Sequence, residues 1–460
     1  MFGMFRRIYE SFISPPEVPK TDNALRFGLL GASDIAYVLH PKSQQNEAEA
    51  DHGITKGQCH SSVRQKHIRK SSSHVSQRET TREPRNMPKS TASRVFMIAI
   101  KPKDVLNDPS IDCIYIPLPN SHHYEWAIRA IAAGKHVLLE KPSTSNGAEA
   151  KKLFEHPVVT APNAPVLLEA FHYPFHPTWQ TFMQLIHNDP LAGPVKSAAS
   201  YFSTPRGYFG KDDIRFRYAL SGGCNMDLAT YCVSQIRQIL GDSRPKVESV
   251  TFRTLSKSEH PENEVEDLEQ IDEAVTATFK SKTGAVGRIG SDFALTGTFL
   301  GMKVPKLEWA KCIAELEEKE VSGEEEEGGK QTKLGDGEKH YVQRMVTLYN
   351  HIGPVVYHSI VVEDKHSIKR DGTTTVKSWT QKNTIKAYDW PDKSDGRQGG
   401  ASWSTYRYQL EEFVNRVKGR KGTGVWVEHQ SSMDQMAVLD EMYEKGGLKV
   451  RPSRAVEVEG

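Results

Sequence analysis

The chain lacks several features that mark membrane, secreted or nucleic-acid-binding proteins. In its 460 residues no apolar run approaches the roughly 20 residues that cross a bilayer, and the N-terminus lacks the apolar core of a secretory signal. The five cysteines include no Cys-x-x-Cys pair, which predicts a reducing compartment, and we expect the cytoplasm. The formal net charge of +2 argues against nucleic acid or a membrane surface as an obligatory partner.

Hydrophobic residues are also scarce, at 37% of the chain. A chain of this length needs two domains, so the deficit predicts polar insertions attached to ordinary domains. We expect residues 41–94 to be disordered, because their Ser, Lys, Arg and Gln bury too little apolar surface. No aromatic residue there could stack on bases, which argues against a nucleic-acid arm. Residues 314–340 predict an acidic flexible loop, and residues 1–24 an amphipathic N-terminal arm.

The first strand-like run, residues 25–30, leads into a turn of small residues. A dinucleotide-binding turn needs glycine for its tight bend, and small residues where backbone meets pyrophosphate and where helix packs on strand. Gly31, Ser33 and Ala36 occupy those positions in a degenerate version of the fingerprint. The pattern favours a dinucleotide site, although small residues also occur in ordinary strand–helix turns. No apolar strand precedes a residue that would choose between NAD and NADP.

Residues 113–142 are the clearest unit of the chain. They read as strand, loop, helix, left-handed cap and strand, at residues 113–117, 117–123, 124–133, 134 and 136–139. Such a unit predicts two parallel strands, and ligands of open α/β sheets bind at the carboxyl ends of the strands. Glu140, Lys141 and Pro142 follow the second strand at that end. On position alone, a solvated strand end explains Lys141 better than a functional role does.

The pattern predicts two domains of the α/β class. Residues 25–145 form a Rossmann-like domain with a parallel sheet, and residues 146–460 form an α+β domain with a large, mostly antiparallel sheet open on one face. In the second domain we expect strands at residues 166–171, 196–202, 247–254, 274–279, 285–292, 355–363 and 384–388, and closing helices at 403–417 and 429–443.

A second group of polar residues lies on a helix expected to start after Gly223. Asp227 and Tyr231 are four residues apart and share one face of that helix. A tyrosine with a pKa of about 10 is a poor base at neutral pH, but an adjacent positive charge lowers its pKa. Paired with Lys141, Tyr231 could take a hydroxyl proton while hydride passes to a nicotinamide ring. The alternative is a core tyrosine whose hydroxyl is satisfied within the protein.

Seven short motifs spread over the chain form one set. They are Gly28-x-x-Gly31-x-x-x-Ile35-Ala36, Pro119-Asn-Ser-His-His123, Gly134-Lys-His-Val-Leu-Leu-Glu-Lys-Pro142, Glu169-Ala-Phe-His-Tyr173, Phe175-His-Pro177, Gly223-x-x-Met-Asp227-x-x-x-Tyr231 and Asp440-x-x-Tyr443-x-x-Gly446-Gly-Leu-x-Val-Arg-Pro452. This set resembles the glucose–fructose oxidoreductase / inositol dehydrogenase (Gfo/Idh/MocA) family. Within the family it is most similar to the NADP-dependent D-xylose 1-dehydrogenases and the dimeric dihydrodiol dehydrogenases.

The resemblance implies an oxidoreductase that moves hydride from a secondary or anomeric hydroxyl of a sugar or cyclic diol to NADP, with NAD possible. Oxidation of D-xylose to D-xylono-1,5-lactone is its first implication. Lys141 would orient substrate and cofactor, Tyr231 would be the acid/base, and Asp227 would contact substrate. Pro142 would be a cis proline that aims Lys141 inward. No metal is implied, and the open sheet would form a homodimer. The implied cofactor contacts are Gly28, Gly31, Ser33, Ile35, Ala36, Pro117, Asn120, His123, Glu140, Lys141 and Pro142.

The chain departs from the family pattern at two places. Pro174 stands where relatives usually carry a basic residue, which removes an expected substrate or phosphate contact. Residues 41–100 replace the second strand and its ribose contact, as a retained intron would. A damaged ribose site supports a second hypothesis, a cofactor-binding sensor that has lost turnover, whereas the presence of Lys141 and Tyr231 supports the enzyme.

Overall fold

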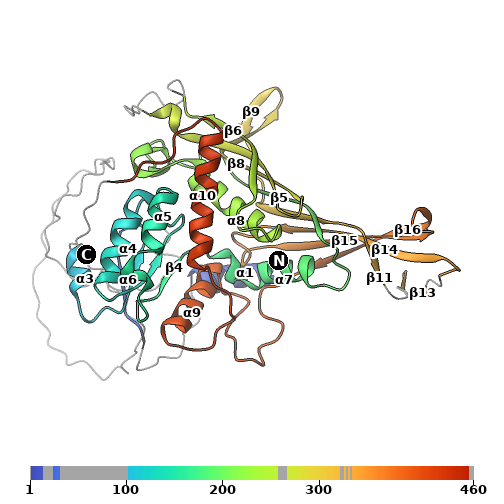
Figure 1. Ribbon diagram of the computed structural model, residues 1–460, viewed down its shortest axis with the longest axis horizontal. Coiled ribbons are helices and arrows are strands. Elements are labelled where there is room, and N and C mark those ends of the chain that lie inside the picture. The colour runs from blue at the N-terminus through green and yellow to red at the C-terminus, as the bar shows by residue number, and fades with distance from the viewer. Residues whose placement is uncertain are drawn as a thin grey trace, which may run out of the picture.

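The computed structural model describes residues 2–13, 24–31, 102–256, 267–321, 326–327, 330–331 and 334–454. Within them, a small helical domain around a parallel sheet lies against a much larger sheet, and the long helix α10 (His429–Lys445) runs along the junction (Figure 1). The segment 41–94, for which disorder is predicted, lies outside the described residues, as do Ser33, Ile35 and Ala36.

The first domain is built on four parallel strands in the order β1-β2-β3-β4. They are β1 (Phe27–Leu29), β2 (Cys113–Ile116), β3 (His136–Leu139) and β4 (Leu167–Glu169). The strands are short and almost wholly apolar, as expected for a parallel sheet buried on both faces. Its helices are α3 (Pro102–Asn107), α4 (His123–Ala132), α5 (Gly147–Phe154) and α6 (Pro157–Thr160). Sequence periodicity therefore predicted this domain well.

Alternating residues of β2 and β3 pack into two different cores. Ile114 and Val137 belong to the core that includes α4 and α5. Cys113 and Leu138 point the other way and pack with Phe413 of α9 (Thr405–Val417). Both β4 and α9 belong to the first domain, although they follow residue 145 in the sequence. The boundary predicted at residue 145 therefore does not coincide with the boundary of the folded domain.

The second domain is dominated by a ten-stranded sheet whose main path runs β16-β15-β14-β10-β5-β8-β7-β6. All neighbouring pairs are antiparallel except β5 and β8, which run parallel. The strands are β5 (Val195–Pro205), β6 (Lys246–Thr254), β7 (Asp272–Lys280), β8 (Val286–Phe299), β9 (Met302–Pro305), β10 (Lys311–Leu316), β11 (Lys319–Val321), β14 (Glu338–Tyr349), β15 (Ser359–Arg370) and β16 (Thr374–Ile385).

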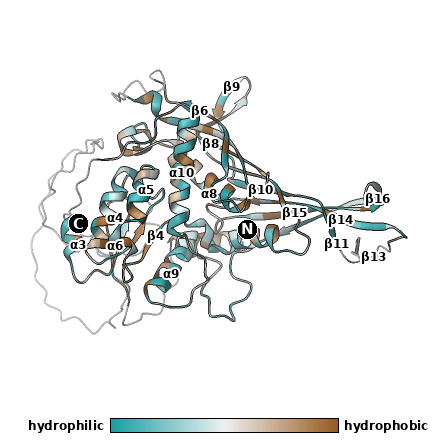
Figure 2. Cartoon of the chain, viewed as in Figure 1, coloured by the Kyte–Doolittle hydropathy of each residue, from teal (hydrophilic) through white to brown (hydrophobic). Residues whose placement is uncertain are grey.

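One face of this sheet is covered by helices. Helix α8 (Thr230–Ile239) packs on β5 and β8, and α7 (Pro177–His187) packs on β14. The strands show the matching alternation: every second residue of β10 is buried and the residues between are half-buried. Figure 2 shows that the outer ends of β14 and β16 are hydrophilic. The predicted open-faced sheet is confirmed.

Three details differ from the sequence-based expectations. Residues 314–340 are not simply a loop, because β11 and the ends of β10 and β14 lie within them, together with the short hairpin of β12 (Glu326–Glu327) and β13 (Lys330–Gln331). The strand expected at 355–363 begins at Ser359 and runs to Arg370, and the strand expected at 384–388 is β16, which ends at Ile385. Most residues of β16 are exposed, so its sequence lacks the apolar alternation that locates a strand, whereas β15 is mostly buried but carries several charged residues.

The N-terminal arm begins with α1 (Phe2–Ile8) and a π-helical turn, η1 (Tyr9–Ile13). Arg7 fixes it to the second domain: its Nε donates to the Val355 carbonyl at 3.0 Å, and its guanidinium lies 3.6 Å from the centre of the Tyr388 ring. The described part of the predicted arm is thus a helix docked on the protein.

Candidate active site

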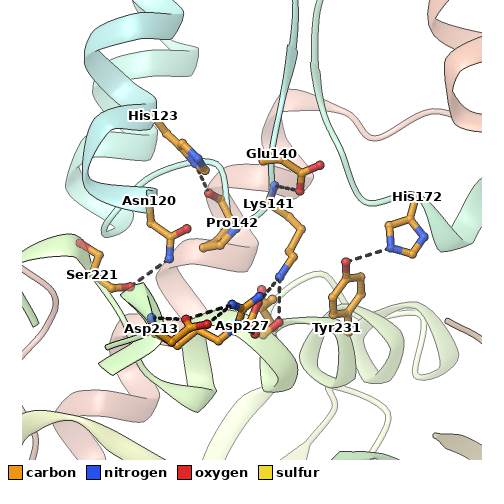
Figure 3. A network of polar contacts seen from close by, with 12 residues as sticks. Asn120, His123, Glu140, Lys141, Pro142, His172, Asp213, Ser221, Asp227 and Tyr231 are labelled. Carbon is orange, nitrogen blue, oxygen red and sulfur yellow. Dashed lines mark hydrogen bonds and ion pairs between the residues drawn. The ribbon is translucent and has the colours of Figure 1, made fainter. Parts of the chain in front are cut away.

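The candidate site lies where the carboxyl ends of β2 and β3 face the start of α8. The loop after β2 carries a 3-10 turn, η2 (Asn120–His122), and Asn120 Nδ2 donates to the Ser221 carbonyl at 2.9 Å (Figure 3). Ser221 itself is in the left-handed region, at φ 59°. This contact joins the first domain, which contains the parallel sheet, to the loop before α8. The loops after β2 and β3 therefore do meet the segment that leads to Asp227 and Tyr231, as the prediction requires.

His123 holds the loops of the first domain together. Its Nδ1 lies 2.8 Å from the Pro142 carbonyl and its Nε2 lies 2.8 Å from the Leu118 carbonyl. The ring is fully buried, and burial lowers the pKa of His123 to about 4. The side chain predicted to contact a cofactor is therefore occupied in positioning Pro142 and the loop after β2.

Glycines at β1 fit the close approach that a dinucleotide requires. Gly31 has φ +107°, and a Cβ there would lie 3.0 Å from the Leu118 side chain and 3.3 Å from the Pro117 carbonyl oxygen. A Cβ on Gly28 would lie only 2.6 Å from Val105 of α3, so glycine permits the helix to pack on the strand. Gly31 thus lies at the carboxyl end of β1, where pyrophosphate binds in this type of sheet, with the loop after β2 packed closely against it.

Glu140 and Lys141 leave β3 in opposite directions. The Glu140 carboxylate accepts a hydrogen bond from the Tyr115 hydroxyl at 2.6 Å and one from the Lys141 amide at 3.2 Å, and burial raises its pKa. The Lys141–Pro142 peptide bond is cis, as expected. Lys141 crosses to the second domain, where its Nζ donates to Asp227 Oδ1 at 2.7 Å and to the Asp227 carbonyl at 3.0 Å (Figure 3).

Asp227 is the centre of a charged cluster. It lies in the π-helical turn η6 (Asn225–Ala229) that leads into α8, and its Oδ2 accepts from Arg215 Nε at 2.6 Å. Arg215 in turn pairs with Asp213 at 3.0 Å. Burial alone would raise the pKa of Asp227, but the positive charges of Lys141 and Arg215 lower it to about 2. Asp227 is therefore ionised at neutral pH and fixes the Lys141 ammonium at the domain junction.

Tyr231 is close to Lys141, but not in the way the sequence suggested. Lys141 Nζ lies 4.8 Å from the centre of the Tyr231 ring, while the hydroxyl lies 2.9 Å from His172 Nε2. The expectation that lysine lowers the pKa of Tyr231 is wrong: the pKa is raised well above its usual value, by burial first and then by Tyr406, Glu140 and Asp227. Burial is the main reason, and the Lys141 ammonium does not offset it, since its hydrogen bonds go to Asp227 and not to the phenol.

Three residues of the site were not found from the sequence. Burial lowers the pKa of His172 to about 3, so its ring is neutral, and it stacks on Tyr406 of α9 with centroids 4.0 Å apart. His172 lies in one of the quoted motifs, but nothing in the motif assigned it a partner. Tyr406 and Arg215 have no local signal, because α9 and the loop before α8 are brought to Tyr231 and Asp227 by tertiary packing alone.

Two features are absent from the part of the chain that the structure describes: a cluster of metal-binding side chains and a helix that could span a membrane. No group of three or more His, Cys, Asp or Glu side chains among them could hold a metal ion. None of the helices they form is long and apolar enough to cross a membrane.

Comparison with known proteins shows which family models and which relatives the chain resembles. Residues 25–158 match the family model described as an oxidoreductase family with an NAD-binding Rossmann fold, and residues 179–304 match the GFO/IDH/MocA C-terminal domain. D-xylose 1-dehydrogenase (NADP(+)) 2 of Haloferax volcanii is 35% identical over 190 residues, which are 41% of this chain and 52% of that protein. Trans-1,2-dihydrobenzene-1,2-diol dehydrogenase of Xenopus laevis is 30% identical over 33% of this chain and 43% of that protein.

The chain thus spans about half the length, or less, of these curated relatives. A solved structure of levoglucosan dehydrogenase, in complex with NADH and L-sorbose, has the same fold, with a TM-score of 0.50 at 16% identity, covering 76% of this chain and 83% of that one. Both domain models of one family match in order along the chain and together cover more than half of it. With the parallel sheet, the open-faced sheet and the motifs between them, the chain belongs to the Gfo/Idh/MocA oxidoreductase family.

Proposed function

We propose that the protein is an NADP-dependent dehydrogenase that oxidises a sugar or cyclic diol, with D-xylose to D-xylono-1,5-lactone as the first candidate reaction. The observation that supports it most is the cluster of Lys141, Asp227 and Tyr231 at the junction of the two domains, beside the glycine turn of β1. The similarity to a D-xylose 1-dehydrogenase that uses NADP(+) supports the choice of substrate and cofactor.

The described residues fit a dinucleotide at the carboxyl ends of β1, β2 and β3. Gly31 lies at the end of β1, and the loops of Pro117, Asn120 and Pro142 border the same end of the sheet. When bound, the nicotinamide ring supplies the acceptor for hydride. Gly31 after β1 and Lys141 after β3 both lie at the carboxyl ends of the parallel strands, which supports a redox role for this end of the sheet.

Lys141 would bind and polarise the substrate hydroxyl. An ammonium group has three N–H donors. The Asp227 carboxylate, through Oδ1, and the Asp227 backbone carbonyl accept two of them. The third is available for the substrate oxygen, where a charge-assisted hydrogen bond stabilises the negative charge that the oxygen gains as its proton leaves. Asp227 holds the ammonium in place and remains ionised, so it orients Lys141 without exchanging protons.

Tyr231 would carry the proton together with His172. A phenol with a raised pKa is not a resting base, so Tyr231 would accept the substrate proton as its own proton moves to His172 Nε2. A neutral imidazole with a pKa of about 3 is adequate here, because a carbonyl oxygen that still carries its proton after hydride loss is a strong acid. In the reverse direction the same pair returns the proton.

The proposal is tested by the appearance of NADPH absorbance with the full-length chain. We expect a rate with NADP and an aldose, highest with D-xylose, when D-xylose, other aldoses, myo-inositol and a trans-dihydrodiol are compared with NADP and NAD. If the protein binds NADP but turns over none of these substrates, the proposal that it is an enzyme is refuted, and the hypothesis of a cofactor-binding sensor is favoured.

We further propose that the protein acts in the cytoplasm as a homodimer formed through the open sheet face. The four cysteines that the structure describes, Cys113, Cys224, Cys232 and Cys312, are buried and unpaired, which suits a reducing compartment. Light scattering after size exclusion tests the dimer, and a single species at the monomer mass, 51.6 kDa, would contradict it.

A further inference from the structure

A second cavity lies behind the helix that carries Tyr231. It has a volume of about 370 Å³ and is lined by α7, α8, α10, the end of β4 and the segment 424–427. That volume is in the lower range of small-molecule sites in proteins. Its α8 residues, Ser234, Arg237 and Gln238, follow Tyr231 within two turns of the helix. The cavity is therefore separate from the cluster around Lys141 but shares a helix with it.

Arg237 is the unusual residue of this cavity. Its side chain is buried, and it donates only to neutral groups: to the Ser243 carbonyl at 2.6 Å, to Gln435 Oε1 at 2.8 Å and to Ser431 Oγ at 3.4 Å. A guanidinium has five N–H donors, so two are left. Burying a charge without a partner is costly, and burial lowers the pKa of Arg237.

The other buried arginines that the structure describes are treated differently. Arg344 pairs with Asp364 at 2.7 Å, and Arg451 pairs with Asp272 at 2.5 Å. Among the described residues, no carboxylate forms an ion pair with Arg237. The charges of Asp434 and Glu169 act on Arg237 from a distance and raise its pKa, but neither carboxylate forms an ion pair with the guanidinium, whose remaining donors are open to an anion in the cavity.

The acidic residue that lines the cavity does not fill this role. Glu169 is buried at the end of β4, and its Oε1 already accepts the Ser143 amide at 2.7 Å. Burial raises the pKa of Glu169 to about 7, which weakens its negative charge at neutral pH. The cavity thus offers a guanidinium that has no ion-pair partner among the described residues.

The rest of the lining suits a ligand with hydroxyl groups. Gln180, Gln238 and Gln435 contribute amides to the lining, and Ser234 and Ser431 contribute hydroxyls. Part of their bonding capacity is used within the protein, since Gln238 bonds to Trp179 and Tyr173. Trp426 and Phe171 add apolar wall of the kind that covers the carbon skeleton of a bound small molecule.

We propose that this cavity binds a small polyhydroxylated carboxylate of the aldonate class, with its carboxylate on Arg237 and its hydroxyls on the surrounding amides and serines. Resting on the proposed function, this is also the class that hydrolysis of a sugar lactone yields. The site would sense product, because Ser234 and Gln238 contact the Tyr173 hydroxyl at 2.9 and 2.5 Å, and the Tyr173 ring packs edge-on against Tyr231 at 6.2 Å.

Isothermal titration of the full-length protein with D-gluconate tests the site without requiring turnover. We expect saturable binding in the millimolar range, as befits a ligand of this size. Sorbitol, which has the hydroxyls but no carboxylate, should not bind. Inorganic phosphate binding more tightly than gluconate would overturn the carboxylate assignment, and absence of saturable gluconate binding would overturn the site.

Variants locate the binding. Arg237→Gln should weaken gluconate binding at least about tenfold, the worth of a charge-assisted hydrogen bond. Arg288→Gln is the matched control, because Arg288 is an exposed arginine of β8 outside the cavity lining. If Arg237→Gln does not fold, Gln180→Trp at the partly exposed wall on α7 should block the cavity and abolish binding. Lys141→Ala should retain it, and loss in Lys141→Ala with retention in the cavity variants would place gluconate in the active site instead.

Discussion

Asp227 and Asp272 are both buried carboxylates of the second domain paired with basic side chains, yet they do different things. Asp272 accepts from Arg451, from the Tyr443 hydroxyl at 3.0 Å and from the Asn225 amide at 2.5 Å, and neither Asp272 nor Arg451 is exposed. The Asp227 side chain keeps 17% of its surface exposed, and one of its cations, Lys141, comes from the other domain.

The surroundings of the two pairs explain the difference. Around Asp272 every position is filled: a Cβ on Gly223 would lie 2.2 Å from its Oδ1. Burial raises the pKa of Asp272 despite Arg451, whereas two cations lower that of Asp227. The fully buried Asp272–Arg451 pair (the sealed pair) fixes the chain in one arrangement. The Asp227–Lys141 pair (the open pair) lies at the domain junction and leaves the lysine with a free donor. Location therefore separates the structural pair from the one proposed to act in catalysis.

The largest expected effect is on turnover at the open pair. Lys141→Ala and Tyr231→Phe should each lower kcat by about 10²–10⁴, the usual contribution of positioned acid–base groups. Initial rates of NADPH formation measure this. Lys135→Ala is the matched control, since Lys135 is another buried lysine, bonded only to the Asp108 and Ile111 carbonyls. A wild-type rate in either site variant would refute the assigned role.

The sealed pair should instead govern stability. Arg451→Met leaves the Asp272 carboxylate buried and without its cation, which costs about 3–5 kcal/mol of unfolding free energy in such cases. Urea denaturation followed by circular dichroism measures the change. The double variant Arg451→Met with Asp272→Leu should recover most of the loss, and a double variant as unstable as the single one would show that packing, not charge, is what Arg451 provides.

The open pair should make a smaller, pH-dependent contribution to stability. The pKa of Asp227 is about 2 in the folded protein and near 4 when unfolded, so its ionised form stabilises the fold above pH 4. This contribution, about 2 kcal/mol, is lost as the pH falls from about 4 to 2. Asp227→Asn should therefore be less stable than wild type at pH 7 and approach it near pH 2. A constant difference between pH 7 and 3 in urea denaturation would contradict the lowered pKa.

The smallest effect is expected at His172. Replacing it by phenylalanine keeps the stacking on Tyr406 but removes one neutral hydrogen bond from Tyr231, which is worth about 1 kcal/mol. We expect kcat to fall about fivefold with KM unchanged. A rise in KM alone would mean that His172 shapes the substrate site without sharing the proton.

Local signals predicted much of the fold and half of the site. Gly134 adopts φ +75° at the end of α4, and β3 occupies residues 136–139 as expected, because a cap and a short apolar run are written in adjacent residues. Lys141 and Asp227 were identified through motifs and do meet. The partner of Tyr231 was not predictable, since His172 reaches it only through the packing of β4 and α9 around α8.

The strands of the outer sheet were the least predictable elements. Most residues of β16 are exposed, so neither face imposes an apolar alternation on the sequence. The charged segment after β10 has the composition of a loop, although Glu320 and Lys339 lie on paired strands and bond to each other at 2.9 Å. Cross-strand pairing of this kind is a property of two distant segments and has no signature in either one.

The position of α9 has a consequence for how the protein is made. Cys113, Tyr115, Leu138 and Leu168 present one apolar side of the parallel sheet, and the helix that covers it is Thr405–Val417. During synthesis, that side stays bare while the whole second domain is translated. We expect the nascent first domain to bind chaperones until the ribosome has released α9, and a chain truncated before Thr405 to aggregate through this side of its sheet.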